Sequence, residues 1–233
     1  MANILLTGAS RGIGAAARTL LEQSGHTVIG QSTAGDDGLI PADFAQPRAA
    51  DALWATALEQ AGGRIDVLVN NAGVFEAAPI CDADGFAATW ARSHAINLQS
   101  AADLCRHAVL HFQENGGGRI INVASRAGHR GDSPHHWHYA AAKGGMLAMT
   151  KSIARGYAAQ NILAFAITPG FTMTGMAEEY LASRGGDKLL ADIPLGRVAM
   201  PEEVAEMIRW LASVAPASMT GATLDINGAS YVR

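Results

Sequence analysis

Short apolar runs that alternate with longer helical stretches constrain the fold of this chain more than any other feature. β-rich runs lie at residues 3–7, 27–30, 64–70, 119–124, 162–167 and 222–226. Ala- and Leu-rich stretches with helical spacing lie at residues 12–24, 47–61, 84–114, 139–160 and 201–213. Short, nearly all-apolar strands that alternate with helices indicate βαβ units around a parallel sheet with both faces covered. We therefore predict an α/β fold with a doubly wound parallel sheet.

The whole chain is expected to form a single domain, residues 1–233, because no linker, repeat or low-complexity tract divides it. Its net charge of −4 disfavours nucleic acid as a partner. Two cysteines, Cys81 and Cys105, form no C-x-x-C pair and indicate a reducing compartment. The sequence shows neither a signal peptide nor an apolar run of ~18 residues, so we expect a cytoplasmic protein without a membrane partner.

One connection is too short for a crossover helix. The polar segment 31–39 separates the strand 27–30 from a candidate strand at 39–42. A βαβ crossover usually takes at least ~10–12 residues, so we expect a loop or a single turn there.

A glycine-rich turn follows the first strand and opens the first helix. It runs from Thr7 to Gly14, with glycines at positions 8, 12 and 14. Glycines in this context let the backbone approach a pyrophosphate, and the helix N-terminus supplies free N–H groups. The turn therefore predicts a dinucleotide site, although a tight turn with close strand–helix packing is the alternative.

Tyr139 and Lys143 are four residues apart at the start of a helix, so they share a face. An ammonium group within ~4–6 Å lowers the pKa of a phenol, which favours proton transfer. Ser125 ends a neighbouring strand at the carboxyl edge of the sheet, where its hydroxyl can donate to a carbonyl oxygen. Taken singly, each residue has an ordinary packing or solvent-facing alternative; together they predict a catalytic set.

The order of motifs resembles that of the classical short-chain dehydrogenases/reductases over essentially the whole chain. The matching segments are Thr7-Gly8-x-x-x-Gly12-x-Gly14, Asn70-Asn71-Ala72-Gly73, Asn97, Ser125, Tyr139-x-x-x-Lys143 and Pro169-Gly170-x-Thr172. The resemblance implies a Rossmann fold. The ending around Gly228-Ala229 is similar to that of 3-oxoacyl-[acyl-carrier-protein] reductases.

The resemblance also implies residue roles. Tyr139 would exchange a proton with the substrate and Ser125 would hold its oxygen. Lys143 would bind the nicotinamide ribose, and Asn97 would hold a water molecule. The implied cofactor contacts are Gly8, Ser10, Arg11, Gly12, Ile13, Gly14, Asp43, Phe44, Asn70, Ala72, Gly73, Tyr139, Lys143, Pro169, Gly170 and Thr172. No metal site is expected, because the histidine-rich run 128–138 lacks metal-ligand spacing and is better explained as a solvent-facing or substrate-lining loop.

The cofactor is expected to be NADP(H) rather than NAD(H). An acidic residue at the end of the second strand usually selects NAD, and none stands there. Arg11 lies in the glycine turn. In related reductases an arginine at this place often contacts the 2′-phosphate of NADP. Asp36 and Asp37 are nearby, and their carboxylates could repel the 2′-phosphate, which counts against NADP(H).

The predicted function is hydride transfer between this cofactor and a carbonyl or secondary alcohol. The leading hypothesis is a ketone reductase of 3-oxoacyl type. Diol, sugar or steroid alcohol dehydrogenases share the same site residues. A nonenzymatic nicotinamide-binding redox sensor is the alternative of another class. The resemblance further implies a homotetramer, built through the helices at 84–114 and 139–160 and the last strand, and a substrate flap at residues 171–197.

Overall fold

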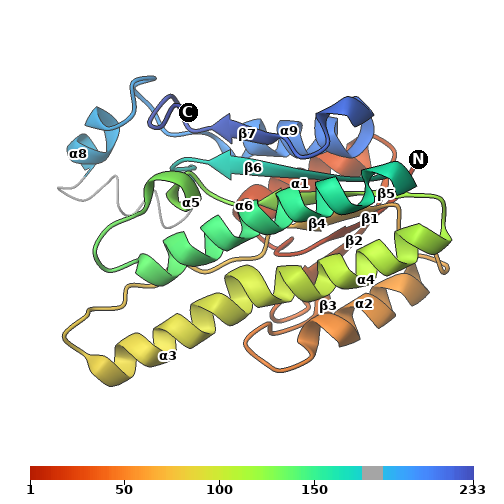
Figure 1. Ribbon diagram of the computed structural model, residues 1–233, viewed down its shortest axis with the longest axis horizontal. Coiled ribbons are helices and arrows are strands. Elements are labelled where there is room, and N and C mark those ends of the chain that lie inside the picture. The colour runs from red at the N-terminus through yellow and green to blue at the C-terminus, as the bar shows by residue number, and fades with distance from the viewer. Residues whose placement is uncertain (175–185) are drawn as a thin grey trace.

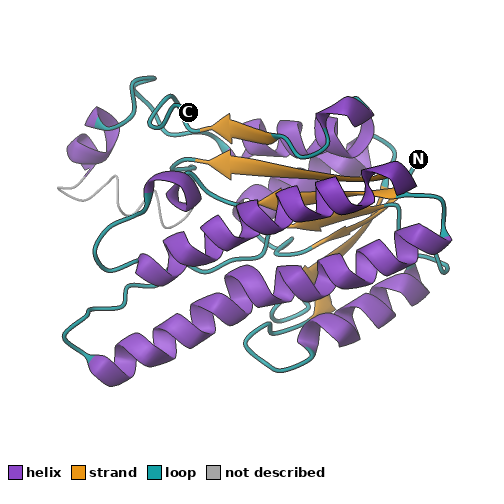
Figure 2. Ribbon diagram, in the orientation of Figure 1, coloured by secondary structure: helices purple, strands orange, loops and turns teal. Residues whose placement is uncertain are grey.

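The computed structural model describes residues 1–174 and 186–233, and its strands form one parallel sheet. The strand order is β3-β2-β1-β4-β5-β6-β7 (Figures 1 and 2). The strands are β1 (Asn3–Leu6), β2 (Thr27–Ser32), β3 (Ile40–Pro41), β4 (Val67–Asn70), β5 (Gly118–Val123), β6 (Ile162–Pro169) and β7 (Thr223–Ile226). This confirms the predicted doubly wound α/β architecture. The chain runs outward from β1 to β3 and returns beside β1 at β4, and such a reversal is where open α/β sheets bind ligands.

Helices cover both faces of the sheet. They are α1 (Gly12–Gln23), α2 (Ala49–Gln60), α3 (Ala83–His94), α4 (Ser100–Glu114), α5 (Ala127–Arg130), α6 (Trp137–Tyr157), α8 (Gly186–Ala191) and α9 (Pro201–Ser213). Helices α1 and α9 pack against each other on one face, and α2, α4 and α6 line the other (Figure 1). Successive side chains of β1 point to opposite faces of the sheet. Leu5 packs against the helices α2 and α4 on one face, whereas Ile4 and Leu6 pack against α1 and α9 on the other. Both faces are buried, which explains why the strands are apolar throughout.

The helical stretch predicted at 84–114 is interrupted. It consists of α3 and α4 joined by a π turn, Ala95–Gln99, that contains Asn97. Single π turns of this kind occur frequently at functional sites. The connection between β2 and β3 holds one short 3₁₀ turn, Asp36–Gly38, as predicted.

The histidine-rich run differs from the predicted loop. Its first residues belong to α5, and α6 begins at Trp137, two residues before Tyr139. His138 is fully buried. Of the predicted flap, residues 175–185 lie outside the described residues. Among the described helices, none is long and apolar enough to cross a bilayer.

Candidate active site

The glycine turn joins β1 to α1 and admits no side chain at two of its glycines. A Cβ atom on Gly14 would lie 1.9 Å from the backbone oxygen of Gly8. A Cβ atom on Gly8 would lie 2.8 Å from Cα of Ala72, and Gly8 also has a positive φ of 67°. The turn therefore presents bare backbone at a helix N-terminus, which fits the pyrophosphate of a dinucleotide. Ser10 and Arg11 are exposed at its tip, and Ile13 is partly buried in α1.

Side chains that the sequence reasoning missed hold this turn in place. Asn71 donates from Nδ2 to the backbone oxygens of Thr7 (3.0 Å) and Gly8 (3.1 Å). Gln31, buried at the end of β2, accepts from the Gly8 N–H at 2.9 Å and donates to the Ala42 oxygen at 2.7 Å. Polar residues at the ends of apolar strands were the signal that could have identified them.

The residues expected on the adenosine side of the candidate site differ in how their side chains are placed. Ala72 lies against Gly8, and Asp43 accepts from the Ala45 N–H at 3.0 Å. Asn70 points into the interior instead, where Nδ2 donates to Oδ1 of Asn122 at 2.8 Å and to Cys105. Its side chain is committed to the core between β4 and β5. The ring of Phe44 is likewise buried in the core, which leaves its backbone for contact.

The end of β2 carries no acidic side chain. Ser32 is buried and accepts from the Gly35 N–H at 2.9 Å. Arg11 makes no hydrogen bond or ion pair with any described residue, whereas Arg18 is bound to Glu22 at 3.0 Å. Among the described residues, Arg11 is thus a cation without a partner beside the glycine turn.

Ser125, Tyr139 and Lys143 meet at the carboxyl edge of the sheet. Lys143 is buried; its Nζ donates to the Val123 oxygen at 2.8 Å and lies 5.8 Å from the ring centre of Tyr139. Ser125 follows β5, forms a side-chain hydrogen bond with Tyr139 and accepts from the Ala127 N–H at 3.1 Å. An ammonium group has three donors, and Val123 uses one of those of Lys143. The remaining donors fit ribose hydroxyls.

The electrostatics of this set differ from the expectation. Burial raises the pKa of Tyr139 to about 12, and the hydrogen bond with Ser125 offsets only part of that rise. Burial also lowers the pKa of Lys143 to about 8. The phenol pKa is therefore raised, not lowered as expected, in the cofactor-free protein: burial is the largest cause, Asp132 adds to the rise, and Lys143 is not among the groups that shift this pKa.

Asn97 is fully buried in the π turn, and its side chain is already occupied. Oδ1 accepts from the Val74 N–H at 2.9 Å. Nδ2 donates to the Val74 oxygen at 3.0 Å and to Ser93 at 2.9 Å. A Cβ atom on Gly73 would lie 2.8 Å from Oδ1 of Asn97 and 3.7 Å from Nζ of Lys143. Asn97 therefore fixes the segment after β4 beside Lys143.

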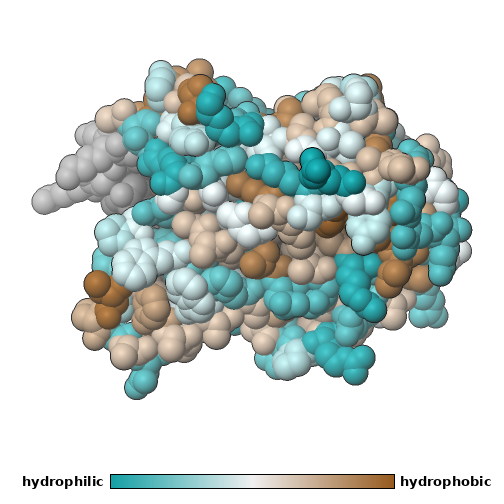
Figure 3. All heavy atoms as spheres, in the orientation of Figure 1, coloured by the Kyte–Doolittle hydropathy of each residue, from teal (hydrophilic) through white to brown (hydrophobic). Residues whose placement is uncertain are grey.

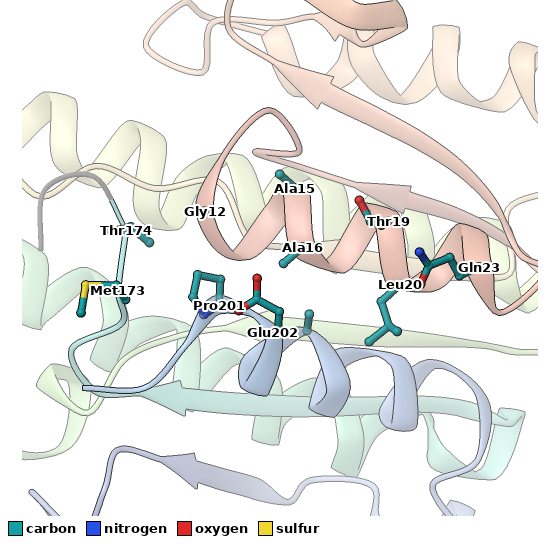
Figure 4. A pocket seen from close by; sticks show the side chains of 11 residues that line it. Gly12, Ala15, Ala16, Thr19, Leu20, Gln23, Met173, Thr174, Pro201 and Glu202 are labelled. Atoms are coloured by element: carbon teal, nitrogen blue, oxygen red, sulfur yellow. The ribbon is translucent and has the colours of Figure 1, made fainter. Parts of the chain in front are cut away.

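The segment after β6 closes the same edge. Gly170 lies so close to the residue that follows β7 that a Cβ atom would be 2.9 Å from Cα of Asn227. Thr172 is buried and forms an isolated parallel β-bridge with Ala199. A pocket of about 530 Å³ lies between α1 and the first turn of α9, with Met173 and Thr174 at one end (Figure 4). It borders the glycine turn at Gly12 and is not lined by Ser125, Tyr139 or Lys143.

Aromatic and cationic side chains surround Tyr139 and Ser125. The rings of Phe75 and His136 stack at 3.8 Å, and Phe75 meets the Tyr139 ring edge-on at 4.9 Å. Arg126 directly follows Ser125 and is buried, which the sequence reasoning did not single out. In the described ranges, no group of His, Cys, Asp and Glu side chains is arranged to hold a metal ion.

Comparison with known proteins agrees with this geometry. Residues 8–229 match the family model described as enoyl-(acyl carrier protein) reductase. The chain is 34% identical to the 3-oxoacyl-[acyl-carrier-protein] reductase FabG of Vibrio cholerae, over 98% of this chain and 96% of that protein. It is 37% identical to the cis-4-hydroxycyclohexanecarboxylate dehydrogenase of Sinomonas cyclohexanicum, over 96% and 94%. It is 32% identical to the acetoacetyl-CoA reductase of Rhizobium meliloti, over 97% of both.

The family match covers nearly the whole chain, and its motifs meet at one edge of the sheet in the order the sequence places them. The chain therefore belongs to the short-chain dehydrogenase/reductase family, and it is an NAD(P)-dependent oxidoreductase of carbonyl and CH–OH groups.

Proposed function

We propose that this protein reduces a ketone of 3-oxoacyl type with NADPH. The observation that carries the proposal is the meeting of Ser125, the partly buried Tyr139 and the buried Lys143 at the sheet edge. With its pKa raised to about 12, the phenol holds its proton at neutral pH but is a weak acid, so proton transfer to a carbonyl oxygen requires that Lys143 lower this pKa in the loaded enzyme. The names of several relatives as 3-oxoacyl reductases support the substrate class.

The chain's own residues divide the work. The Ser125 hydroxyl donates to the ketone oxygen and holds it within reach of the phenol. Tyr139 protonates that oxygen as negative charge develops on it. Lys143 holds the ribose through the donors that Val123 leaves free. The cofactor supplies the hydride.

Asn97 takes part through its backbone in this proposal. Its side chain is fully used by Val74 and Ser93, so a relay water would bond to its carbonyl. The π turn that holds Asn97 interrupts the regular helical ladder, which is where a carbonyl becomes available.

The preference for NADPH rests on Arg11, which has no partner in the part of the chain that the structure describes, and on the end of β2, which bears no carboxylate. A guanidinium matches a 2′-phosphate through paired donors. We expect Arg11→Ala to weaken NADPH binding about tenfold while NADH binding changes little. Fluorescence titration of both cofactors measures this, and equal losses would remove the basis for the preference.

We further propose a cytoplasmic, single-domain protein that assembles as a homotetramer through the face that carries α4 and α6. Hydrophobic and hydrophilic side chains are mixed on that face (Figure 3), and Leu110 of α4 is 47% exposed there.

The test is NADPH oxidation with a panel of neutral 3-oxo thioesters, other ketones and, in reverse, secondary alcohols. Tyr139→Phe should lower kcat by about 10²- to 10⁴-fold while cofactor binding persists. A wild-type rate for that variant would contradict the assignment. Cofactor binding without turnover of any compound would favour the redox-sensor alternative.

A further inference from the structure

Arg126 is a buried cation beside the proposed catalytic serine. Its side chain is 9% exposed, although arginine is rarely buried without full pairing. Its backbone N–H donates to the Pro169 oxygen at 3.1 Å, and its guanidinium lies over the ring of Phe171, 5.3 Å from the ring centre. The backbone of Arg126 thus ties the end of β5 to the end of β6 directly after Ser125, and its guanidinium lies against Phe171 and Asp192, in segments that follow β6.

The guanidinium is poorly satisfied by the protein. A guanidinium has five donors, yet in the described ranges only Nη1 of Arg126 has an acceptor: Oδ2 of Asp192, at 3.4 Å. Arg130 donates to the same oxygen at 3.0 Å and to the Ser230 oxygen at 2.9 Å. Two cations thus share one carboxylate, and that carboxylate is about half exposed.

The surrounding charges leave Arg126 short of anionic partners. Burial lowers its pKa most, and repulsion from Arg130 adds to that effect; Asp192 and Asp132 oppose it. Asp132 is exposed, and its carboxylate accepts from the Ser133 N–H. A second carboxylate at Arg126 would relieve this imbalance, because a planar guanidinium binds carboxylates through two parallel bonds.

We propose that Arg126, supported by Arg130, binds a carboxylate of the substrate, so that the enzyme prefers oxo acids and hydroxy acids to neutral ketones. Asp192 occupies part of this site in the free protein. The inference rests on the proposed ketone reduction and replaces the 3-oxoacyl thioester by a free oxo acid as the preferred substrate.

The test compares a carboxylate with its matched neutral amide. Wild-type enzyme should reduce 4-oxocyclohexanecarboxylate with a higher kcat/KM than 4-oxocyclohexanecarboxamide. Arg126→Met should lower this acid-to-amide ratio about 10- to 100-fold, mainly through KM for the acid. Arg126→Lys should recover part of the ratio. Arg155→Met, an exposed arginine at the far end of α6, should leave the ratio unchanged.

Asp192→Asn separates a binding role from a structural one. If Asp192 competes with the substrate, its removal should raise the acid-to-amide ratio severalfold. If the ion pairs only hold the segment after α8 against α5, both compounds should suffer equally and the ratio should stay constant, which would overturn the inference. A wild-type preference for the amide, or a ratio that survives Arg126→Met in a folded variant, would overturn the inference.

A binding measurement keeps this inference distinct from the proposed function. Calorimetry should show that cyclohexanecarboxylate binds to the cofactor-loaded wild type and does not bind to the cofactor-loaded Arg126→Met variant. Arg126-dependent binding without reduction of any ketone would sink the proposed function alone. Reduction of neutral thioesters and acids with no effect of Arg126 would sink the inference alone.

Discussion

The glycine turn and the surroundings of Arg126 lie at the same edge of the sheet but are held in different ways. Around the turn, side chains bond to backbone: Asn71 to the oxygens of Thr7 and Gly8, and Gln31 to the Gly8 N–H. The Arg126 guanidinium contacts only side chains among the described residues, Asp192 and the Phe171 ring, although Arg130 beside it also donates to the Ser230 backbone oxygen. A side chain that must bond to a fixed backbone atom can be replaced by few other residue types. Two side chains that contact each other can be replaced together by another matching pair. The first arrangement suits an invariant ligand part such as a pyrophosphate, and the second suits a variable substrate.

The strongest test of this contrast is Gly14→Ala. The new Cβ atom would collide with the Gly8 oxygen at 1.9 Å, so the turn or α1 must shift. We expect a loss of more than about 3 kcal/mol in the free energy of unfolding, together with loss of cofactor binding. Urea unfolding and cofactor titration measure the two effects.

Gly156→Ala is the matched control, because Gly156 lies in α6 with no neighbour within 4 Å of a new Cβ atom. It should stabilise the protein by about 0.5–1 kcal/mol through helix propensity. If both alanines had similar effects, the turn would not depend on a bare backbone.

Lys143, between the two regions, predicts a pH effect in the cofactor-free protein. Its pKa is about 8 in the folded state and 10.5 for an ordinary lysine, so the unfolded chain binds more protons between these values. Burial of the ammonium therefore destabilises the fold fully below pH 8, and stability rises as pH increases toward 10.5. Relative to Lys143→Met, wild type should gain about 2–3 kcal/mol between pH 7.5 and 10.

Chemical unfolding at several pH values measures this gain, with Lys151→Met on the exposed side of the same helix as the matched control. The measurement stops at pH 10 because of Tyr139, whose pKa rises from 10.0 to about 12 on folding. Between these two values, this shift makes the free energy of unfolding fall as pH increases, which is opposite to the effect of Lys143. A constant difference between wild type and Lys143→Met would contradict the burial of a charged lysine.

The contrast also explains how far the sequence alone could be interpreted. The strands, the short β2–β3 connection and the glycine turn follow from hydrophobic period and backbone geometry, which are local properties. The inward turn of Asn70 toward Asn122 was not predictable, because it depends on a contact between β4 and β5. The raised pKa of Tyr139 depends on how tightly distant segments exclude water, which no spacing of residues records. Arg126 was missed for the same reason, since its partner Asp192 is 66 residues away.

Asn71→Ala tests the backbone-directed bonds without a steric clash. It removes the donors to the Thr7 and Gly8 oxygens, and we expect a loss of about 2 kcal/mol in the free energy of unfolding. Asn71→Asp should cost at least as much, because a carboxylate has the same shape and cannot donate. Tolerance of aspartate would show that these two bonds do not hold the turn.

The smallest effect is expected on the substrate side, at His136. Its ring stacks on Phe75 and its Nδ1 bonds to the Ser133 hydroxyl at 2.7 Å, but it is only partly buried. His136→Ala should cost about 1 kcal/mol or less in the free energy of unfolding, because an exposed stack contributes little beyond its buried area. Phe75 then loses its stacking partner beside Tyr139, so kcat/KM for bulky ketones should rise relative to small ones. A loss of stability as large as that of Asn71→Ala would break the contrast, since it would make the substrate side as demanding of residue type as the glycine turn.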